Sequence, residues 1–303
     1  MAPSIIDTPW NTAAKAGALA AAGVTTVMRY YNFANSRALP EKCLTLVEAE
    51  ALSAAGIAIG VVFQQRQNVI DDFDRAKGRR AGRRAFALAH DEIGQPDGAA
   101  IYFGVDFDAS EAEVDDRIAP YFEGVAEAMR EEAAGEPPYR IGVYGSGLVG
   151  RLLGERGLAD LVWLGMARGF RETRQALDEG RYDLEQVPPA TTLLGLGVDH
   201  NNAHPDGRDF GAFTVPVDAA PAEPRPGPGP VPGEAATRLR VTARSGLRLR
   251  AGPGTGFDVV GAMALGEIVH DAGRHGDWVR VDRQGDGAVD GFAFTDFLEP
   301  AIG

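Results

Sequence analysis

Residues 100–110 read Ala100-Ile101-Tyr102-Phe103-Gly104-Val105-Asp106-Phe107-Asp108-Ala109-Ser110, an apolar run that ends in two carboxylates. Such a run is typical of a buried parallel strand, which we expect over Ala99–Phe107. Side chains alternate faces along a strand, so Asp106 and Asp108 are predicted to project from the same side. Ser110 and Glu113 then match a capping box that begins a helix. The two acids therefore lie in a strand-to-helix turn, where α/β enzymes place their catalytic groups.

The same strand-and-helix pattern recurs along residues 1–218. The other predicted strands are Ser4–Asp7, Thr25–Tyr31, Ala58–Gln64, Arg140–Tyr144, Leu161–Met166, Asp183–Val187 and Leu193–Val198. Strands that alternate with helices favour an α/β fold, and their number favours a (β/α)₈ TIM-like barrel over an open sheet. Roughly 215 residues are few for such a barrel, which typically has ~250. The last helices are therefore expected to be short or missing.

The composition of the chain changes after residue 218. Residues 219–236 are rich in proline and glycine, which favour an extended backbone, so this segment is predicted to be a linker. Residues 237–303 contain short runs in which apolar and polar side chains alternate, such as Leu247–Arg250 and Trp278–Val281. This part is predicted to form a separate, small all-β barrel.

Charge and composition argue against several classes of function. Thirty basic and 43 acidic residues give a net charge of −13, which disfavours a nucleic-acid partner. The single cysteine, Cys43, cannot form an internal disulfide. No apolar run approaches the roughly 20 residues of a membrane span, and the first residues do not resemble a signal peptide. We therefore expect a protein made in the cytoplasm that reaches any outside target by a route without a leader.

Three other motifs have simpler explanations than a ligand site. Gly145–Gly150 has the letters of a dinucleotide-binding fingerprint, but it follows the fifth strand and lacks the acidic ribose partner, so tight-turn glycines explain it. The basic run Lys77–Arg84 is interpreted as a solvated helix face. A group of polar residues near the end of the barrel matches no standard metal-binding spacing: Asp199, His200, His204 and Asp209. No metal and no cofactor is predicted.

Acidic residues end three of the predicted strands. Asp7 ends the first strand, Asp106 and Asp108 the fourth, and Asp199 the eighth. Each acid alone could be a helix cap or half of an ion pair. A parallel barrel, however, brings the carboxyl ends of its strands to one face. Together the acids predict a carboxylate cluster suited to glycosidic cleavage.

Aromatic and hydrogen-bonding side chains near the same strand ends are suited to sugar binding. The predicted substrate-binding residues are Arg29, Tyr30, Gln64, Tyr144, Trp163 and Gln186. The aromatic rings would stack on sugar faces, and the other three side chains would donate hydrogen bonds. Any one of these residues could instead belong to the core.

Several segments together resemble a known family. They are Ile6–Trp10, Tyr102–Asp108, Ile141–Ser146, Val162–Leu164 and Val198–Asn201. In this order they resemble the bacterial glycoside-hydrolase-like barrel family, which is related to the family-25 lysozymes. Three later segments, Gly246–Thr255, Asp277–Val281 and Asp290–Leu298, resemble a bacterial SH3 domain, a module that often tethers cell-wall hydrolases to peptidoglycan.

The resemblance implies a peptidoglycan-directed, muramidase-like glycoside hydrolase with an SH3-type targeting domain. Asp7, Asp106 and Asp199 match acids of the lysozyme site, whereas Asp108 stands where those lysozymes have the longer glutamate. On this hypothesis Asp108 protonates the glycosidic oxygen and Asp106 orients the acetamido group or a water. Asp7 and Asp199 shape the surrounding charge, and no cofactor is needed.

Two other functions fit the same features. The protein could be a non-catalytic binder of cell-wall glycan, in which aspartate at position 108 marks lost chemistry. It could also be a delivered effector or a structural component of a secretion machine or a phage-like particle. In each case the expected ligand is peptidoglycan or a related N-acetylated glycan. The protein is expected to bind this ligand at the cell wall, which it reaches by non-classical delivery or after lysis.

Overall fold

The computed structural model describes two stretches of the chain, residues 4–217 and 238–301. Within the second stretch, gaps fall at residues 244–245, 251, 255–256, 258, 276–277 and 286–288. The chain divides into two compact units, Met1–Ala220 and Pro221–Gly303. The predicted linker, 219–236, lies outside the described residues, and each unit is described by itself.

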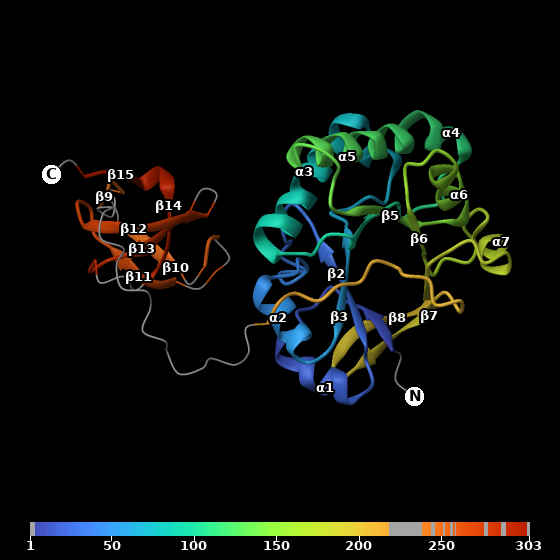
Figure 1. Ribbon diagram of the computed structural model, residues 1–303, viewed down its shortest axis with the longest axis horizontal. Helices are drawn as coiled ribbons and strands as arrows, with labels where there is room; N and C mark the ends of the chain where they lie inside the picture. The colour runs from blue at the N-terminus through green and yellow to red at the C-terminus, as the bar shows by residue number, and fades with distance from the viewer. Residues whose placement is uncertain are drawn as a thin grey trace. The chain divides into compact units, whose positions relative to one another are not determined.

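The first unit is a closed barrel in which the strands follow one another in sequence order (Figure 1). Its strands are β1 (Ile5–Asp7), β2 (Thr26–Tyr31), β3 (Ala58–Phe63), β4 (Ala100–Gly104), β5 (Arg140–Gly145), β6 (Leu161–Leu164), β7 (Leu184–Leu193) and β8 (Leu196–Ala203). Strands β1 to β7 run parallel to one another. Strand β8 runs antiparallel to both of its neighbours, β7 and β1. The barrel is therefore mixed.

The prediction of an eight-stranded barrel is confirmed, but the direction expected for its last strand is wrong. Strands β7 and β8 form a hairpin joined by Leu194 and Gly195, whose φ angles are 52° and 79°. Two consecutive positive φ angles fit a tight two-residue hairpin turn, which leaves no space for a helix. Asp199, expected at the carboxyl end of a parallel strand, therefore lies inside β8 instead.

Helices cover the outside of the barrel (Figure 1). They are α1 (Ala16–Ala21), α2 (Leu46–Ala54), α3 (Arg75–Ala87), α4 (Glu111–Glu113), α5 (Ala119–Glu132), α6 (Gly147–Glu155) and α7 (Thr173–Asp178). Short 3₁₀ turns occur at Ala13–Lys15 and Ile70–Asp72, and π-helical turns at Leu88–Ile93 and Val114–Ile118. The Ser110–Glu113 capping box begins α4 as predicted. The residues Gly145–Gly150 end β5 and begin α6, with the Ser146 hydroxyl accepting from the Val149 N–H.

Helices α3 and α5 pack closely because glycines line their contact. A Cβ atom on Gly82 would lie 2.7 Å from the Val125 carbonyl oxygen, and one on Gly78 would overlap the carbonyl of Tyr121. A gap this small admits only a hydrogen atom at these positions. Because the two backbones meet there, the long charged side chains of both helices lie along the edge of the contact.

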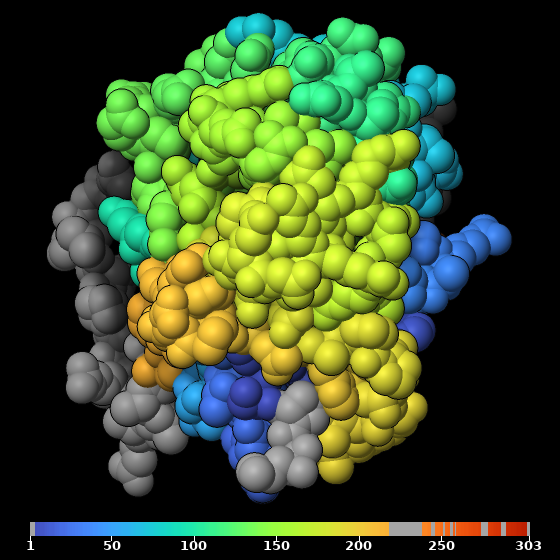
Figure 2. All heavy atoms as spheres, turned by 90° about the vertical axis from the view of Figure 1, so that its right-hand side faces the viewer, coloured from blue at the N-terminus to red at the C-terminus, as the bar shows by residue number. Residues whose placement is uncertain are grey.

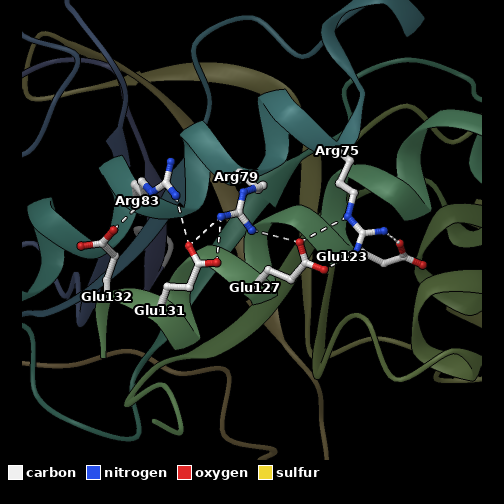
Figure 3. A network of polar contacts seen from close by, with 7 residues as sticks. All are labelled: Arg75, Arg79, Arg83, Glu123, Glu127, Glu131 and Glu132. Carbon is white, nitrogen blue, oxygen red and sulfur yellow. Dashed lines mark hydrogen bonds and ion pairs between the residues drawn. The ribbon is translucent and has the colours of Figure 1, made fainter. Parts of the chain in front are cut away.

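Those side chains form an ion-pair ladder between the two helices (Figure 3). It consists of Arg75, Arg79, Arg83, Glu123, Glu127, Glu131 and Glu132. Glu131, for example, accepts from Arg79 at 2.6 Å and from Arg83 at 3.1 Å. The basic run expected to be a solvated face is therefore only partly solvated, because two of its arginines, Arg79 and Arg83, pair with glutamates of α5.

Two hydrophobic cores fill the barrel unit. The larger one lies between strands and helices and includes Val27, Tyr31 and Phe103. The smaller one fills the barrel interior and includes Tyr102 and Trp163. Figure 2 shows the side of this unit on which the segment from α7 to β7, drawn yellow-green to yellow, forms a continuous surface. The interior core reaches the carboxyl ends of the strands, where Val62 of β3 and Trp163 of β6 belong to it.

The second unit is a single seven-stranded sheet in the order β11-β10-β14-β13-β12-β9-β15. Its strands are β9 (Arg238–Val241), β10 (Leu247–Arg250), β11 (Val259–Met263), β12 (Ile268–His275), β13 (Trp278–Asp282), β14 (Gly291–Phe294) and β15 (Leu298–Pro300). Alternate side chains of β9, β10 and β13, such as Leu239, Leu249 and Val279, form its core. In the described residues, no helix is both long and apolar enough to cross a membrane.

Candidate active site

A cavity of about 260 Å³ opens at the carboxyl ends of the parallel strands. Its lining residues are Tyr30, Val62, Gln64, Asp106, Tyr144, Trp163, Met166, Gln186 and Asp199. They come from every strand from β2 to β8, or from the turns that follow these strands. Seven of the predicted site residues thus meet in one place, which we call the carboxylate cavity.

Asp7 and Asp199 lie side by side, but only Asp199 lines this cavity. They are paired across β1 and β8, and the Gln186 side-chain N–H group donates to Asp7 Oδ2 at 3.0 Å and to Asp199 Oδ2 at 3.1 Å. Asn201 Nδ2 donates to the same oxygen of Asp7 at 2.8 Å. The two carboxyl groups are therefore held together by a shared amide.

Burial raises the pKa values of both aspartates. The pKa of Asp7 rises from 3.8 to about 7, mainly because the carboxyl group is desolvated; the Asn201 hydrogen bond opposes this rise and the nearby Asp199 charge adds to it. The pKa of Asp199 is also raised by burial, with His200 acting against it. Asp199 Oδ1 is buried and has no hydrogen-bond partner among the described residues. These two carboxyl groups therefore hold protons more strongly than ordinary aspartates.

The orientation of the shared amide is set by its other hydrogen bonds. Gln186 Oε1 accepts from the Tyr144 hydroxyl at 2.9 Å and from the Met166 N–H at 3.3 Å. Its NH₂ group must then face the carboxylates, because the oxygen is already committed. Trp163 acts in the same way on Asn201, by donating to the Asn201 side-chain oxygen at 2.8 Å. Tyr144 and Trp163, predicted to stack on sugars, thus also orient the two amides that hold the carboxyl groups in place.

Asp106 also lines the carboxylate cavity, but unlike Asp7 and Asp199 it is exposed to solvent. Its backbone N–H donates to the carbonyl oxygen of Gln67, in the loop after β3, at 2.8 Å. Gln64 Nε2 donates to its Oδ2 at 3.2 Å. Lys42 lies close by, with Nζ 4.6 Å from the centroid of the Tyr30 ring, and burial lowers its pKa while the Asp106 charge raises it.

Asp108 does not line the cavity. Strand β4 ends at Gly104, three residues before the predicted end, so the strand alternation that placed Asp106 and Asp108 on one face does not reach them. Asp108 Oδ1 accepts from the backbone N–H of Arg171 at 2.7 Å, and Oδ2 pairs with its guanidinium at 2.7 Å. The structure therefore ties Asp108 to the segment before α7.

Arg29 does not reach the cavity either, contrary to expectation. Its side chain is fully buried and forms an ion pair with Glu48 at 2.8 Å. Strand alternation explains this position, because Tyr30 points into the barrel interior and its neighbour must point outward. Arg29 thus holds β2 to α2. The Glu48 N–H donates to the Thr45 hydroxyl at the start of α2, and the Glu48 carboxylate binds Arg29 and Thr12.

Sequence reasoning missed two residues near the carboxylates, Asn201 and Lys42. Asn201 follows Asp199 by two positions and so shares its face of β8, a signal that was available once β8 was extended past Val198. Lys42 lies in the long loop after β2, where no pattern indicated it. In the part of the chain that the structure describes, no cluster of three or more His, Cys, Asp or Glu residues is suited to hold a metal ion.

Comparisons with known proteins identify relatives of the barrel unit. The uncharacterized protein YbfG of Bacillus subtilis is 32% identical over 212 residues, which are 67% of this chain and 29% of YbfG. The uncharacterized protein FadG of the same organism is 27% identical over 208 residues, 68% of this chain and 35% of FadG. The chain thus spans about a third of the length of these curated relatives.

A solved structure shows the same fold. The crystal structure of the Tat-secreted protein Rv2525c of Mycobacterium tuberculosis with L-tartrate has a TM-score of 0.56 and 23% sequence identity, over 70% of this chain and 99% of that chain. Residues 245–299 match the bacterial SH3 domain, as the sequence predicted. Residues 17–200, more than half of the chain, match the Rv2525c-like, glycoside hydrolase-like domain. The chain therefore belongs to the Rv2525c-like, glycoside hydrolase-like family and carries a bacterial SH3 domain after its barrel.

Proposed function

We propose that the barrel unit hydrolyses glycosidic bonds in an N-acetylated glycan of the bacterial cell wall. One observation carries this proposal: two carboxyl groups in different environments line the same cavity. Asp199 is half-buried and has a raised pKa, whereas Asp106 is exposed. Glycosidases need one carboxyl group that delivers a proton and a second that acts as a carboxylate. The glycoside hydrolase-like family of the barrel supports the same reaction class.

In this proposal Asp199 is the proton donor. Asp199 lines the cavity and its pKa is raised by burial, so its carboxyl group can keep a proton and deliver it to the glycosidic oxygen. Asp106 orients the attacking water or the acetamido group of the sugar. Asp7, whose carboxyl group is bonded to the same amide, sets the charge next to Asp199.

The aromatic side chains supply the walls of the sugar site. Tyr30, Tyr144 and Trp163 all line the cavity, and the Trp163 ring lies 4.9 Å from that of Tyr144 at an interplanar angle of 70°. Sugar rings present apolar faces that pack well on such surfaces. Gln64, which bonds Asp106, has a side chain in reach of the same ligand.

The SH3 unit indicates where the barrel unit acts. We assign it the role of holding the protein on peptidoglycan, which makes the barrel unit active at the cell wall outside the cytoplasm. The relative Rv2525c is a Tat-secreted protein, which supports an extracytoplasmic site for this chain as well. A partner in a secretion machine or a phage-like particle has no comparable support.

A non-catalytic glycan-binding protein is the second candidate, and Asp108 favours it. Both carboxylate oxygens of Asp108 are bound by Arg171. An acid held in this way is not free to protonate a substrate. If no other acid replaces it, the same cavity binds glycan without cleaving it.

Mass spectrometry separates the two candidates. Purified peptidoglycan is incubated with the full chain, and the soluble fragments are compared with those from the heat-denatured protein. Hydrolysis predicts new fragments with reducing ends that accumulate with time. Retention of the protein on the wall with no new fragment after long incubation supports the binding protein and contradicts the hydrolase.

A further inference from the structure

A second cavity, of about 150 Å³, lies on the same face of the barrel unit. Its walls come from the loops after β2 and β3 and from helices α3 and α5. Its lining includes the charged and aromatic residues Phe33, Arg66, Asp72, Lys77, Arg80 and Tyr121. We call it the cationic cavity. Gln64 lines the carboxylate cavity and the next residue, Gln65, lines this one, so the two cavities are neighbours on either side of one loop.

Positive charge dominates the cationic cavity. Arg66, Lys77 and Arg80 line it with a single carboxylate, Asp72, although the whole chain carries a net charge of −13. Lys77 is already paired with Asp74 at 2.9 Å. The side chains of Arg66 and Arg80 have neither an ion pair nor a hydrogen bond among the described residues. Two guanidinium groups are therefore available to an anion.

The position of these guanidinium groups is set by neighbouring contacts. Arg80 lies over the Phe33 ring, with its guanidinium carbon 5.2 Å from the ring centroid. The loop that carries Arg66 is held by Gln67, a buried residue with a φ of 51°. Gln67 Oε1 accepts from the backbone N–H groups of Gln65 and Arg66, at 2.7 and 3.0 Å. A left-handed backbone at a residue other than glycine costs free energy, which points to a required loop shape.

Tyr121 provides an independent sign of a ligand. Its side chain is 1% exposed and lines the cationic cavity, yet its hydroxyl group has no hydrogen-bond partner among the described residues. Leaving a buried hydroxyl unpaired costs about 1–3 kcal/mol. An acceptor bound in the cavity would remove this cost by accepting from the hydroxyl.

We propose that the cationic cavity binds a small carboxylate, of the kind borne by the acidic peptides attached to wall glycan. Arg66 and Arg80 pair with the carboxylate oxygens, since a guanidinium fork matches a carboxylate in geometry and charge. The Tyr121 hydroxyl donates a further hydrogen bond, and Phe33 packs against the carbon atoms next to the charge. That the carboxylate and the sugar belong to one polymer rests on the proposed function.

Isothermal titration of the full chain with N-acetyl-L-alanyl-D-glutamate tests this site. We expect saturable binding with one site per chain and at least about tenfold weaker binding of the diamide of the same peptide, which lacks both charges. Arg66→Gln with Arg80→Gln should weaken the acidic peptide about tenfold or more. The matched control is Arg75→Gln with Arg83→Gln, which removes the same charge from the ladder outside the cavity and should leave the affinity unchanged.

Tyr121→Phe separates ligand binding from a structural role. It should lower the affinity for the acidic peptide without lowering the melting temperature of the free protein, since the hydroxyl has no partner to lose. The proposal is overturned if the peptide does not bind saturably or if its diamide binds equally well. Equal losses in the two double arginine variants would also overturn it, because they would show general charge attraction only.

A second titration distinguishes this inference from the proposed function. Neutral oligomers of N-acetylglucosamine carry no carboxylate and should bind the wild type and the Arg66→Gln, Arg80→Gln variant equally. If these oligomers fail to bind the wild type, sugar binding by the carboxylate cavity fails. The titrations with the acidic peptide would still show whether the cationic cavity binds a carboxylate.

Discussion

Asp7 and Asp199 accept hydrogen bonds from the same side-chain nitrogen, Gln186 Nε2, at 3.0 and 3.1 Å. This contact exists because β8 runs antiparallel to β1 and places the two residues directly opposite each other. Two carboxyl groups held so close in a buried site cannot both ionise without cost. The reversed last strand thus creates the unusual acid chemistry of the carboxylate cavity.

We predict that Asp7 makes the barrel unit less stable as the pH rises from about 4 to 7. Its pKa is 3.8 ordinarily and about 7 in the folded protein, so the folded state keeps a proton that the unfolded chain has released. The free energy of unfolding then falls with pH across this interval. Asp7→Asn removes this titration and should gain on the order of 4 kcal/mol over the wild type between pH 4 and 8.

Urea unfolding of both proteins at several pH values measures this effect. The wild-type curve should approach that of the variant at low pH, where the carboxyl group is protonated in both states, and fall below it near pH 8. Parallel curves over the whole range would mean that burial does not raise the pKa of Asp7.

The barrel was predictable from sequence because its strands and caps are local signals. The run that ends at Gly104 and the Ser110–Glu113 capping box both depend on neighbouring residues alone. The direction of β8 was not predictable in the same way. It depends on a two-residue turn at Leu194, a residue type that seldom takes a positive φ.

The candidate site was predictable where strand alternation holds and not where the chain leaves the strand. Tyr30 and Tyr144 lie in strands and line the cavity as expected. Arg29 was assigned to the wrong side, although its neighbour Tyr30 already fixed the alternation. Asp108 lies beyond the end of β4, so its position depends on Arg171, which is 63 residues away in sequence.

Glu48→Gln should destabilise the barrel unit by about 3–5 kcal/mol, because it leaves the fully buried Arg29 without a counter-charge. Glu123→Gln is the matched control. It breaks a pair with Arg75 in which both side chains are about half exposed, and such pairs contribute about 0–1 kcal/mol. Urea unfolding checks both variants. Equal losses would show that the buried pair is no more important than the surface pair.

Gly78→Ala should destabilise the barrel unit by about 3 kcal/mol or more, because a methyl group there overlaps the Tyr121 carbonyl in the contact between α3 and α5. Gly154→Ala provides the comparison. It lies in α6 with nothing within 4 Å of the new methyl group, so it should stabilise by about 0.5–1 kcal/mol. Thermal unfolding measures the two shifts. Stabilisation by Gly78→Ala would contradict the close helix contact.

Limited proteolysis should cut the chain between about Ala219 and Glu234 and leave two resistant fragments. The proline-rich sequence of this segment cannot form regular hydrogen bonds, and the chain divides into two units near Ala220. Mass spectrometry of the fragments locates the cut. Resistance of this segment, or rapid loss of either fragment, would argue against two independently folded domains.

Turnover of purified peptidoglycan by Asp199→Asn tests the proposed hydrolase most directly. The matched control is Asp183→Asn, because burial also raises the pKa of Asp183, but this residue lies outside the carboxylate cavity and accepts from the Val162 N–H at 2.8 Å. Rates of reducing-end release should fall about 10²- to 10⁴-fold in Asp199→Asn, with wall binding kept. Asp183→Asn and Asp108→Asn should remain close to wild type. Wild-type turnover by Asp199→Asn, or a comparable loss in Asp108→Asn, would contradict the assignment of Asp199 as the proton donor.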